Sequence, residues 1–232
     1  MKQIKNNIQQ LQTQIKQAET KHHRPTGSVK LLAVSKTWPA HLLREVADTG
    51  QYRFGENYLQ EALIKIHELS DLPLEWHFIG PIQSNKTKEI AQHFDWVHSI
   101  DRLKIARRLT EQRPKNLPPL NTCIQVNIDN EVSKSGVITN EVFPLAKQIY
   151  RMEHLKLRGL MIIPSRHQDQ HYSSFRKAHD LFTALADTYP DIDTLSMGMS
   201  VDMEVAIANG STMVRIGTAL FGDRISSTNK AE

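Results

Sequence analysis

The hydrophobic positions of this chain follow two alternating patterns. Short runs of β-branched and aromatic residues, typical of buried strands, alternate with longer stretches in which apolar residues recur every three or four positions, typical of helices. The runs predict strands at residues 30–36, 52–57, 76–80, 96–100, 122–128, 156–163, 194–197 and 213–219. The longer stretches predict helices at 40–48, 58–68, 86–93, 102–111, 141–153, 172–188 and 203–208.

The regular alternation of strands and helices predicts an α/β protein. Two strands joined through a helix pair in parallel with a right-handed crossover. Eight such strands can close into a (β/α)8 barrel or form an open doubly wound sheet. The count of eight favours the barrel, and the first strand is not followed by the G-x-G-x-x-G turn of a dinucleotide-binding sheet. We therefore predict a single-domain (β/α)8 TIM-type barrel over residues 28–224.

The two ends of the chain differ from the barrel region. Apolar residues at helical spacing with polar residues between them predict an extra amphipathic helix over residues 1–20, docked on the barrel. These residues are Ile4, Ile8, Leu11, Ile15 and Ala18. At the other end, residues 225–232 are polar, and we expect them to form a flexible tail.

Composition narrows the class of protein further. A hydrophobic content of 39% is sufficient for a large core. The net charge is +4, but the basic residues are interleaved with 25 acidic ones, so we expect no specific nucleic-acid partner. The single cysteine, Cys123, excludes an intramolecular disulfide and is expected to be a buried thiol in a reducing compartment. No apolar run approaches a membrane span or a signal core, so we expect a cytoplasmic protein with no membrane partner.

Polar residues gather where the predicted strands end. In a barrel of this kind the active face lies at the carboxyl ends of the strands. Lys36 ends the first strand and Asn57 the second, while the remaining candidates follow the seventh strand or belong to the eighth. The candidate site residues are Lys36, Asn57, Ser200, Arg215, Gly217 and Thr218.

Three of these residues suggest an anion site. Ser200 precedes a helical stretch and is expected to be its N-cap, so that its hydroxyl and the free N–H groups of the first turn could hold a phosphate. Gly217 allows close approach of the backbone to a ligand, and Thr218 adds a hydroxyl. In the alternative interpretation Ser200 only caps its helix and Gly217 only relieves crowding, without a ligand.

Together with the anion site, Lys36 and Arg215 suggest that the ligand is a carbonyl compound that bears a phosphate. Strand alternation places Arg215 in the barrel interior, where it meets either a ligand or an acidic residue such as Glu56 or Asp202. A lysine amine forms a Schiff base with an aldehyde. Pyridoxal 5'-phosphate (PLP) fits all the contacts, with its aldehyde on Lys36, its phosphate on the anion site and its ring nitrogen facing Arg215. An arginine there leaves the ring nitrogen unprotonated, which makes the ring a weak electron sink.

Other polar residues have simpler interpretations. Lys86 and Lys134 are either solvated loop lysines or secondary contacts for an anion or for PLP in transfer, and His77 is expected in the core. His167 and His171 have helical spacing, but no third ligand lies nearby in the sequence, so we expect no metal.

Seven motifs in order between residues 31 and 222 resemble the YggS/PROSC family, the PLP homeostasis proteins. The motifs are A-V-S-K-T, F-G-E-N-Y-L-Q-E, W-H-F-I-G-P-I-Q-S-N-K, S-K-S-G, R-G-L-M, S-M-G-M-S and G-S-T-M-V-R-I-G-T-A-L-F-G. The resemblance implies a fold-type III PLP barrel like the N-terminal domain of alanine racemase, with PLP on Lys36 and Asn57 beside it. It also implies phosphate contacts at Ser200, Gly217 and Thr218, and Arg215 beneath the ring.

The resemblance implies a PLP-binding protein in vitamin B6 homeostasis, with no established turnover and no catalytic residue. We also expect a monomer. PLP-dependent apo-enzymes are the expected recipients of its PLP. The main alternative is a fold-type III enzyme such as an amino-acid racemase. Such enzymes take a second catalytic base from a C-terminal β domain, which we do not expect here because the sequence stops soon after Gly222. Two further alternatives are a Schiff-base aldolase, whose lysine usually lies on the sixth strand, and a nucleic-acid or partner-binding module that uses the first helix.

Overall fold

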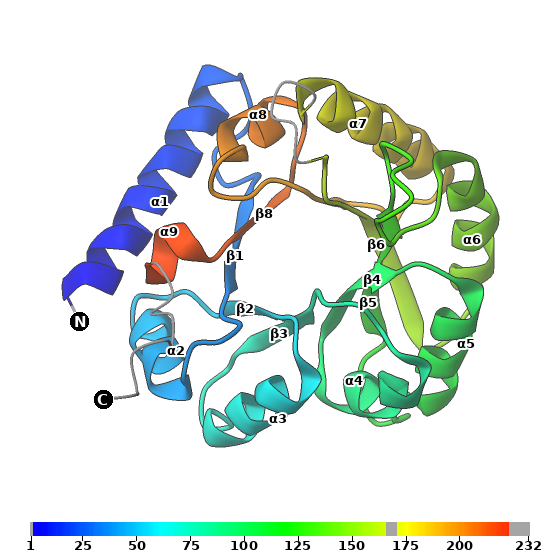
Figure 1. The fold of residues 1–232 in the computed structure, drawn as a ribbon, viewed down its shortest axis with the longest axis horizontal. Coiled ribbons are helices and arrows are strands. Elements are labelled where there is room, and N and C mark those ends of the chain that lie inside the picture. The colour runs from blue at the N-terminus through cyan, green and yellow to red at the C-terminus, as the bar shows by residue number, and fades with distance from the viewer. Residues whose placement is uncertain (1, 166–170, 223–232) are drawn as a thin grey trace, which may run out of the picture.

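Eight parallel strands close into a barrel in the order in which they occur along the chain (Figure 1). The computed structural model describes residues 2–165 and 171–222. The barrel closes where β1 pairs with β8, from Lys30 opposite Met213 to Ala33 opposite Ile216. The strands are β1 (Lys30–Val34), β2 (Arg53–Glu56), β3 (Glu75–Phe78), β4 (Trp96–Ile100), β5 (Leu120–Val126), β6 (Leu155–Ile162), β7 (Thr194–Ser196) and β8 (Met213–Ile216). The predicted (β/α)8 barrel is therefore confirmed.

Helices surround the barrel and cover its outer face (Figure 1). They are α1 (Lys2–Lys21), α2 (Ala40–Ala47), α3 (Leu59–Glu68), α4 (Thr87–His93), α5 (Leu103–Gln112), α6 (Val142–Ile149), α7 (His171–Thr188), α8 (Met203–Ala208) and α9 (Thr218–Phe221). Two short 3-10 turns, η1 (Ser84–Lys86) and η2 (Thr139–Glu141), precede α4 and α6. Apolar residues of helices and strands form one large core between the two layers.

The first helix lies against the region where the barrel closes. All five of its apolar stripe residues are buried, and α1 contacts α2, α8 and α9 (Figure 1). Burial of these side chains, each of which stabilises a fold by about 1.5–3 kcal/mol when it is as large as isoleucine, explains the position of α1. The predicted tail at residues 225–232 lies outside the described residues.

Seven of the eight strands end one to three residues earlier than predicted. Two of these ends, those of β1 and β8, lie at the candidate site. The first strand was expected to reach Lys36, but β1 ends at Val34 because the chain turns: Thr37 has a left-handed backbone (φ 70°), and its neighbour Trp38 donates an N–H to the Ser35 carbonyl (3.1 Å). The last strand was expected to reach residue 219. Instead β8 ends at Ile216, and the next residues turn into α9.

Two findings concern the environment of the protein. Cys123 is fully buried, as predicted, and burial raises the pKa of its thiol. Within residues 2–165 and 171–222, no helix combines the length and the apolar character needed to cross a membrane.

Candidate functional site

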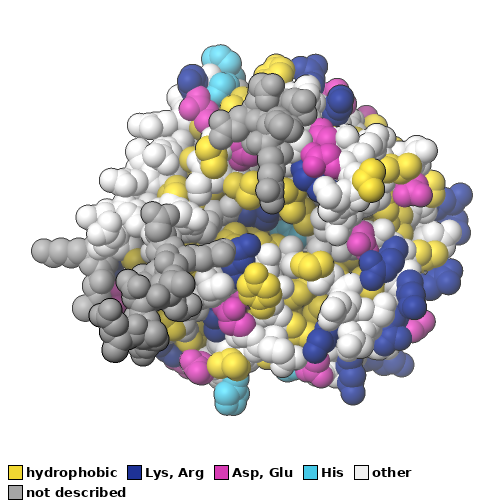
Figure 2. Space-filling model, in the orientation of Figure 1, with side chains coloured by type: hydrophobic (Ala, Val, Ile, Leu, Met, Phe, Trp, Pro, Cys, Tyr) yellow, Lys and Arg dark blue, Asp and Glu magenta, His cyan; other side chains and the backbone are white. Residues whose placement is uncertain are grey.

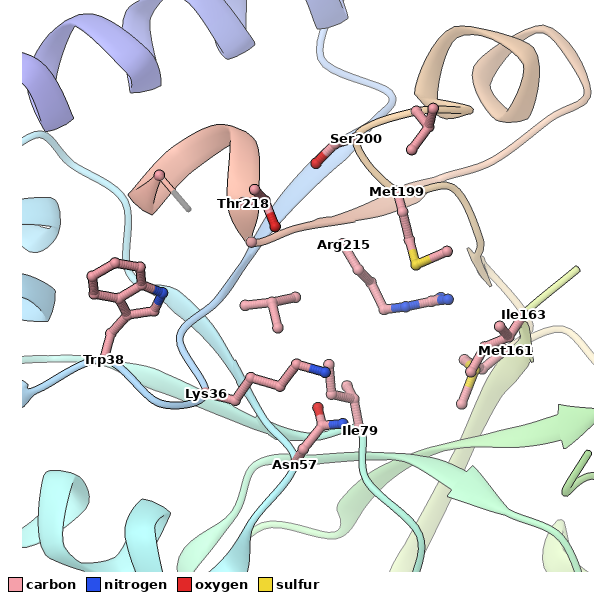
Figure 3. A pocket seen from close by; sticks show the side chains of 14 residues that line it. Lys36, Trp38, Asn57, Ile79, Met161, Ile163, Met199, Ser200, Arg215 and Thr218 are labelled. Carbon is pink, nitrogen blue, oxygen red and sulfur yellow. The ribbon is translucent and has the colours of Figure 1, made fainter. Parts of the chain in front are cut away.

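A cavity of about 480 Å³ lies at the carboxyl ends of the strands, and all six predicted site residues line it (Figure 3). Figure 2, drawn from the same side as Figure 1, shows hydrophobic, Lys and Arg side chains around a hollow in the middle of this face. The described lining residues are Val34, Lys36, Trp38, Asn57, Ile79, Met161, Ile163, Met199, Ser200, Val201, Arg215, Gly217, Thr218 and Gly222. Residues far apart in the sequence therefore meet in one site.

Lys36 reaches the cavity from the turn that follows β1. Its side chain extends into the open space, toward Asn57 and Ile79 (Figure 3). Hydrogen bonds fix the turn on both sides of Lys36. The Thr37 N–H donates to Glu61 Oε1 (2.5 Å), and the Ser35 hydroxyl donates to Glu56 Oε1. The lysine thus projects from a short segment whose two neighbours are both held.

A buried ion cluster beneath this turn was not predicted from the sequence. Lys65 Nζ donates to Glu56 Oε1 (2.7 Å), to Glu61 Oε1 (2.5 Å) and to the Ser35 carbonyl (2.7 Å). Glu56 is fully buried, and burial raises the pKa of its carboxyl, although the adjacent ammonium of Lys65 opposes the rise. The i,i+4 spacing of Glu61 and Lys65 could have indicated their ion pair from the sequence. No such spacing points to Glu56, the buried third residue of the cluster.

Arg215 lies in the floor of the cavity with three oxygen acceptors. Its NH1 donates to the Ser196 carbonyl (2.7 Å) and to Ser196 Oγ (2.9 Å), and its NH2 donates to the Ile162 carbonyl (2.9 Å). Among the described residues, Arg215 forms no ion pair with Glu56 or Asp202, the two alternatives that the sequence offered. Glu56 pairs with Lys65 instead. Burial lowers the pKa of Arg215 to about 10, although the charge of Asp202 opposes this, so the guanidinium stays protonated at neutral pH.

Ser200 is not the helix N-cap that the sequence suggested. The helix α8 begins later, and Asp202 occupies the cap position. Asp202 Oδ1 instead accepts the Met199 N–H (2.6 Å), which closes a turn and leaves Ser200 and Val201 exposed at the rim of the cavity. Thr218 opens α9 on the same side of the cavity (Figure 3). Within residues 2–165 and 171–222, no backbone hydrogen bond uses the N–H groups of Ser200, Val201 or Thr218.

Gly217 packs closely on the first strand. A Cβ added at this position would lie 3.3 Å from the Val34 carbonyl oxygen and 3.5 Å from Val34 Cβ. The glycine therefore relieves crowding between β8 and β1, as one interpretation of the sequence had it, while its backbone also lines the cavity.

Asn57 contributes an amide oxygen that has no hydrogen-bond partner. Its Oδ1 is buried, and no partner for it occurs among the described residues. Buried polar atoms nearly always have a partner, so this oxygen indicates a place where a ligand supplies a donor. The Asn57 backbone is held against Gly80, where an added Cβ would lie 2.2 Å from the Asn57 carbonyl oxygen.

The other candidate residues lie outside the main cavity. Lys134 donates to Glu131 Oε1 (2.9 Å) and to the Pro164 carbonyl (2.7 Å), beside a smaller cavity of about 280 Å³ that shares Asn57 with the first. Lys86 ends η1 and does not line the cavity. His77 is fully buried in the barrel, as predicted.

The sequence offered one candidate pair of metal ligands, His167 and His171, for which no metal was expected. His167 lies outside the described residues. Across the described ranges, no group of three or more His, Cys, Asp or Glu side chains is placed to hold a metal ion.

The apolar walls of the cavity were also missed from the sequence. Trp38 lines one side and stacks on Phe221 of α9, with 5.6 Å between ring centroids and 20° between planes. Met161, Ile163 and Met199 line the opposite side (Figure 3). Apolar residues at strand ends carry no distinctive pattern, and barrel closure alone makes them neighbours.

The barrel and its site belong to a recognisable class. Residues 2–225 match the family described as "Alanine racemase, N-terminal domain", so the chain carries this domain. Curated relatives make the assignment narrower. The chain is 53% identical to the pyridoxal phosphate homeostasis protein of Vibrio cholerae, over 99% of this chain and 100% of that one. It is 54% identical to that of Pseudomonas aeruginosa, over 97% of each chain. The chain belongs to the pyridoxal phosphate homeostasis protein family.

A solved relative carries the ligand that gives the family its name. The structure of PipY from Synechococcus elongatus with PLP bound is similar to this barrel with a TM-score of 0.82 and 35% identity, over 95% of this chain and 100% of PipY.

Proposed function

We propose that this chain binds PLP in the cavity at the carboxyl ends of the strands, holds it as a Schiff base on Lys36 and serves in PLP homeostasis without catalytic turnover. The observation that carries the proposal is the convergence of Lys36, Arg215 and two hydroxyl-bearing rim residues, Ser200 and Thr218, in one cavity. The names of the relatives and the PLP-bound PipY structure support it.

The residues present fit PLP. A volume of about 480 Å³ lies within the range of small-molecule sites. The unused N–H groups of Ser200, Val201 and Thr218 suit the oxygens of a phosphate, and the unpartnered Asn57 oxygen suits a donor on the ring. Lys36 supplies the amine for an aldehyde carbon. When bound, PLP supplies that aldehyde and a pyridine ring that withdraws electrons.

Arg215 limits the chemistry that this site supports. Burial lowers the pKa of Arg215, but the guanidinium stays protonated at neutral pH, so Arg215 donates hydrogen bonds and does not give up a proton. A ring nitrogen that accepts from it stays unprotonated, which weakens electron withdrawal. This favours holding PLP over chemistry that needs a strong electron sink.

The alternative, a racemase-like enzyme, requires a second base on the other side of the cofactor. The described residues that line the cavity include no Asp, Glu, His, Cys or Tyr, and Lys36 is the group that can exchange a proton. We therefore favour a protein without turnover over a fold-type III enzyme. An amino-acid racemisation rate of enzymatic size that disappears in Lys36→Ala would refute this part of the proposal.

We further propose that the chain acts as a cytoplasmic monomer and passes PLP to PLP-dependent apo-enzymes. The fully buried, unpaired thiol of Cys123 suits a reducing compartment. Activation of an apo-enzyme by the PLP-loaded chain, faster than by the same total PLP with the Lys36→Ala variant, is the measurement that tests delivery.

The absorbance spectrum of the purified protein tests the binding itself. We expect an absorbance band from bound PLP, fixed by borohydride onto a peptide containing Lys36 and absent in Lys36→Ala. Lys156→Ala is the matched control, because this lysine is paired with Asp191 and lies outside the main cavity. A colourless protein that also fails to take up added PLP would refute the assignment.

A further inference from the structure

A continuous series of hydrogen bonds crosses the interior of the barrel and ends at Arg215. It begins at Glu75 on β3, whose Oε1 lies 2.8 Å from His77 Nε2. His77 Nδ1 lies 2.9 Å from His98 Nε2, and His98 Nδ1 lies 3.0 Å from Ser196 Oγ. Ser196 Oγ in turn accepts from NH1 of Arg215 (2.9 Å). We call this series the relay.

The relay connects the two ends of the barrel through buried groups. Glu75 is the first residue of β3, at the amino ends of the strands, and its side chain is 39% exposed. His77, His98 and Ser196 are fully buried, and Arg215 faces the cavity at the other end. The ring of His77 stacks on that of Trp96, with 5.2 Å between centroids and 10° between planes. The stack and the two hydrogen bonds of His77 thus define the orientation of its ring.

The chemistry of the two end groups fixes the direction of the hydrogen bonds. A guanidinium only donates, so Ser196 Oγ accepts from Arg215, and a carboxylate only accepts, so His77 Nε2 carries a proton. Between them, the Ser196 hydroxyl proton points to His98 Nδ1, and the His98 Nε2–H points to His77 Nδ1. Both histidines are then neutral, each with its proton on Nε2.

The opposite direction would require an additional proton on the His77 ring, and its surroundings disfavour this. Burial lowers the pKa of His77, although the hydrogen bond and charge of Glu75 oppose it, and burial lowers the pKa of His98 well below its usual value. Burial raises the pKa of the Glu75 carboxyl, but the hydrogen bond from His77 and the nearby positive charges together outweigh burial, so the net shift of this pKa is downward and the carboxyl stays ionised. The charged groups that act on the two rings are Glu75, Asp95, Arg53 and Arg215.

We infer that His98 and Ser196 are positioning residues, which hold the Arg215 guanidinium in the cavity floor through a one-way relay from the Glu75 carboxylate. The relay explains how a buried guanidinium persists without a carboxylate in contact. Each donated proton makes the donating oxygen or ring a better acceptor, so Ser196 Oγ binds Arg215 more strongly than an isolated serine would. NH1 and one hydrogen of NH2 are occupied by protein oxygens, while no hydrogen bond within residues 2–165 and 171–222 uses Nε. The inference rests on the proposed function, because Arg215 is proposed to meet the PLP ring.

The first experiment needs no PLP. Nitrogen NMR of the uniformly labelled chain at neutral pH is expected to show both His77 and His98 neutral with the proton on Nε2. A proton on Nδ1 of either ring, or a charged His77, would overturn the direction of the relay. If wild-type protein fails to bind PLP, the proposed function fails, while the NMR result still decides the relay.

The second experiment compares variants by PLP titration. Ser196→Ala removes the hydroxyl that links His98 to Arg215 and is expected to weaken PLP binding about three- to tenfold, the effect of one hydrogen bond, and to shift the absorbance band of the bound cofactor. The control is Thr122→Val, which removes another buried hydroxyl, one that bonds the Lys156 carbonyl (3.2 Å); it is expected to leave both readouts unchanged.

Variants of His98, the histidine that contacts Ser196, distinguish a role in positioning Arg215 from a role in packing. His98→Gln keeps an acceptor and a donor and is expected to bind PLP closer to wild type than His98→Leu, which keeps neither. If the His98 variants fail to fold, Ser196→Ala with its control still decides the question. Unchanged affinity and spectrum in Ser196→Ala would overturn the inference.

Discussion

Substitution of Lys65 by methionine is predicted to destabilise the fold strongly, because it leaves a buried carboxylate without its cation. The Lys65 side chain is 4% exposed, and that of its partner Glu56 is fully buried. Glu56 Oε1 accepts from Lys65 and Ser35, while Oε2 has no partner in the described part of the chain. Methionine keeps the length and apolar stem of lysine, so the loss is mainly electrostatic.

The magnitude follows from burial. Breaking a buried ion pair by removal of one partner costs about 3–5 kcal/mol. A domain of this kind has about 5–15 kcal/mol of stability in total, so Lys65→Met removes a large share of it. The control is Lys156→Met, in which the lysine pairs with Asp191 at 3.0 Å but both side chains are nearly half exposed. That pair contributes about 0–1 kcal/mol.

The assay is urea unfolding followed by circular dichroism, with a double variant that repairs the charge. In Glu56→Gln with Lys65→Met no charge is left buried in the pair, and the amide can still accept from the Ser35 hydroxyl. We expect this variant to regain most of the stability and to lie within about 2 kcal/mol of wild type. The electrostatic explanation would be refuted if the free energy of unfolding of Lys65→Met lay within about 1 kcal/mol of wild type. It would also be refuted if the double variant were less stable than the single one.

Three further predictions concern other parts of the molecule. Arg215→Ala is expected to weaken PLP binding and change its absorbance spectrum, and unchanged affinity and spectrum in a titration would count against Arg215 as the ring contact. Cys123, whose thiol pKa is raised by burial, is expected to react with iodoacetamide at pH 8 only after denaturation, which mass spectrometry detects; rapid labelling of folded protein would contradict its burial. Ile8→Ala is expected to cost about 2–5 kcal/mol in urea unfolding, since Ile8 is 1% exposed, whereas Ile64→Ala, at a position 60% exposed, should cost less than about 0.5 kcal/mol. Equal losses in these two variants would show that α1 does not depend on its apolar stripe.

The residues that the sequence placed correctly are those whose signals are local. Alternating apolar runs locate all eight strands, and in a parallel barrel the ends of successive strands lie on one face, so the order of the strands is enough to assign Lys36 and Asn57 to one site. Family motifs, which combine short local patterns in order, pointed to PLP. These predictions needed only the order of elements along the chain.

The predictions that were wrong concern residues whose conformation depends on local backbone geometry or on partners that are distant in the sequence. Ser200 was expected to cap α8, but Asp202 takes that position after a turn closed by its own carboxylate. The last strand was expected to continue through Thr218, which instead opens a helix. Strand and helix propensities differ too little over two or three residues to locate such turns.

The sequence by itself determined the eight-fold alternation, the face on which the candidate site lies and the placement of Lys36 there, because these follow from apolar periods of two or four residues and from the order of the strands. Only the tertiary structure decided what Arg215 contacts. Its acceptors come from β6 and β7, and the relay behind it joins β3, β4, β7 and β8. Those strands come together through the register and closure of the barrel, and no local pattern records which of their side chains will meet inside it.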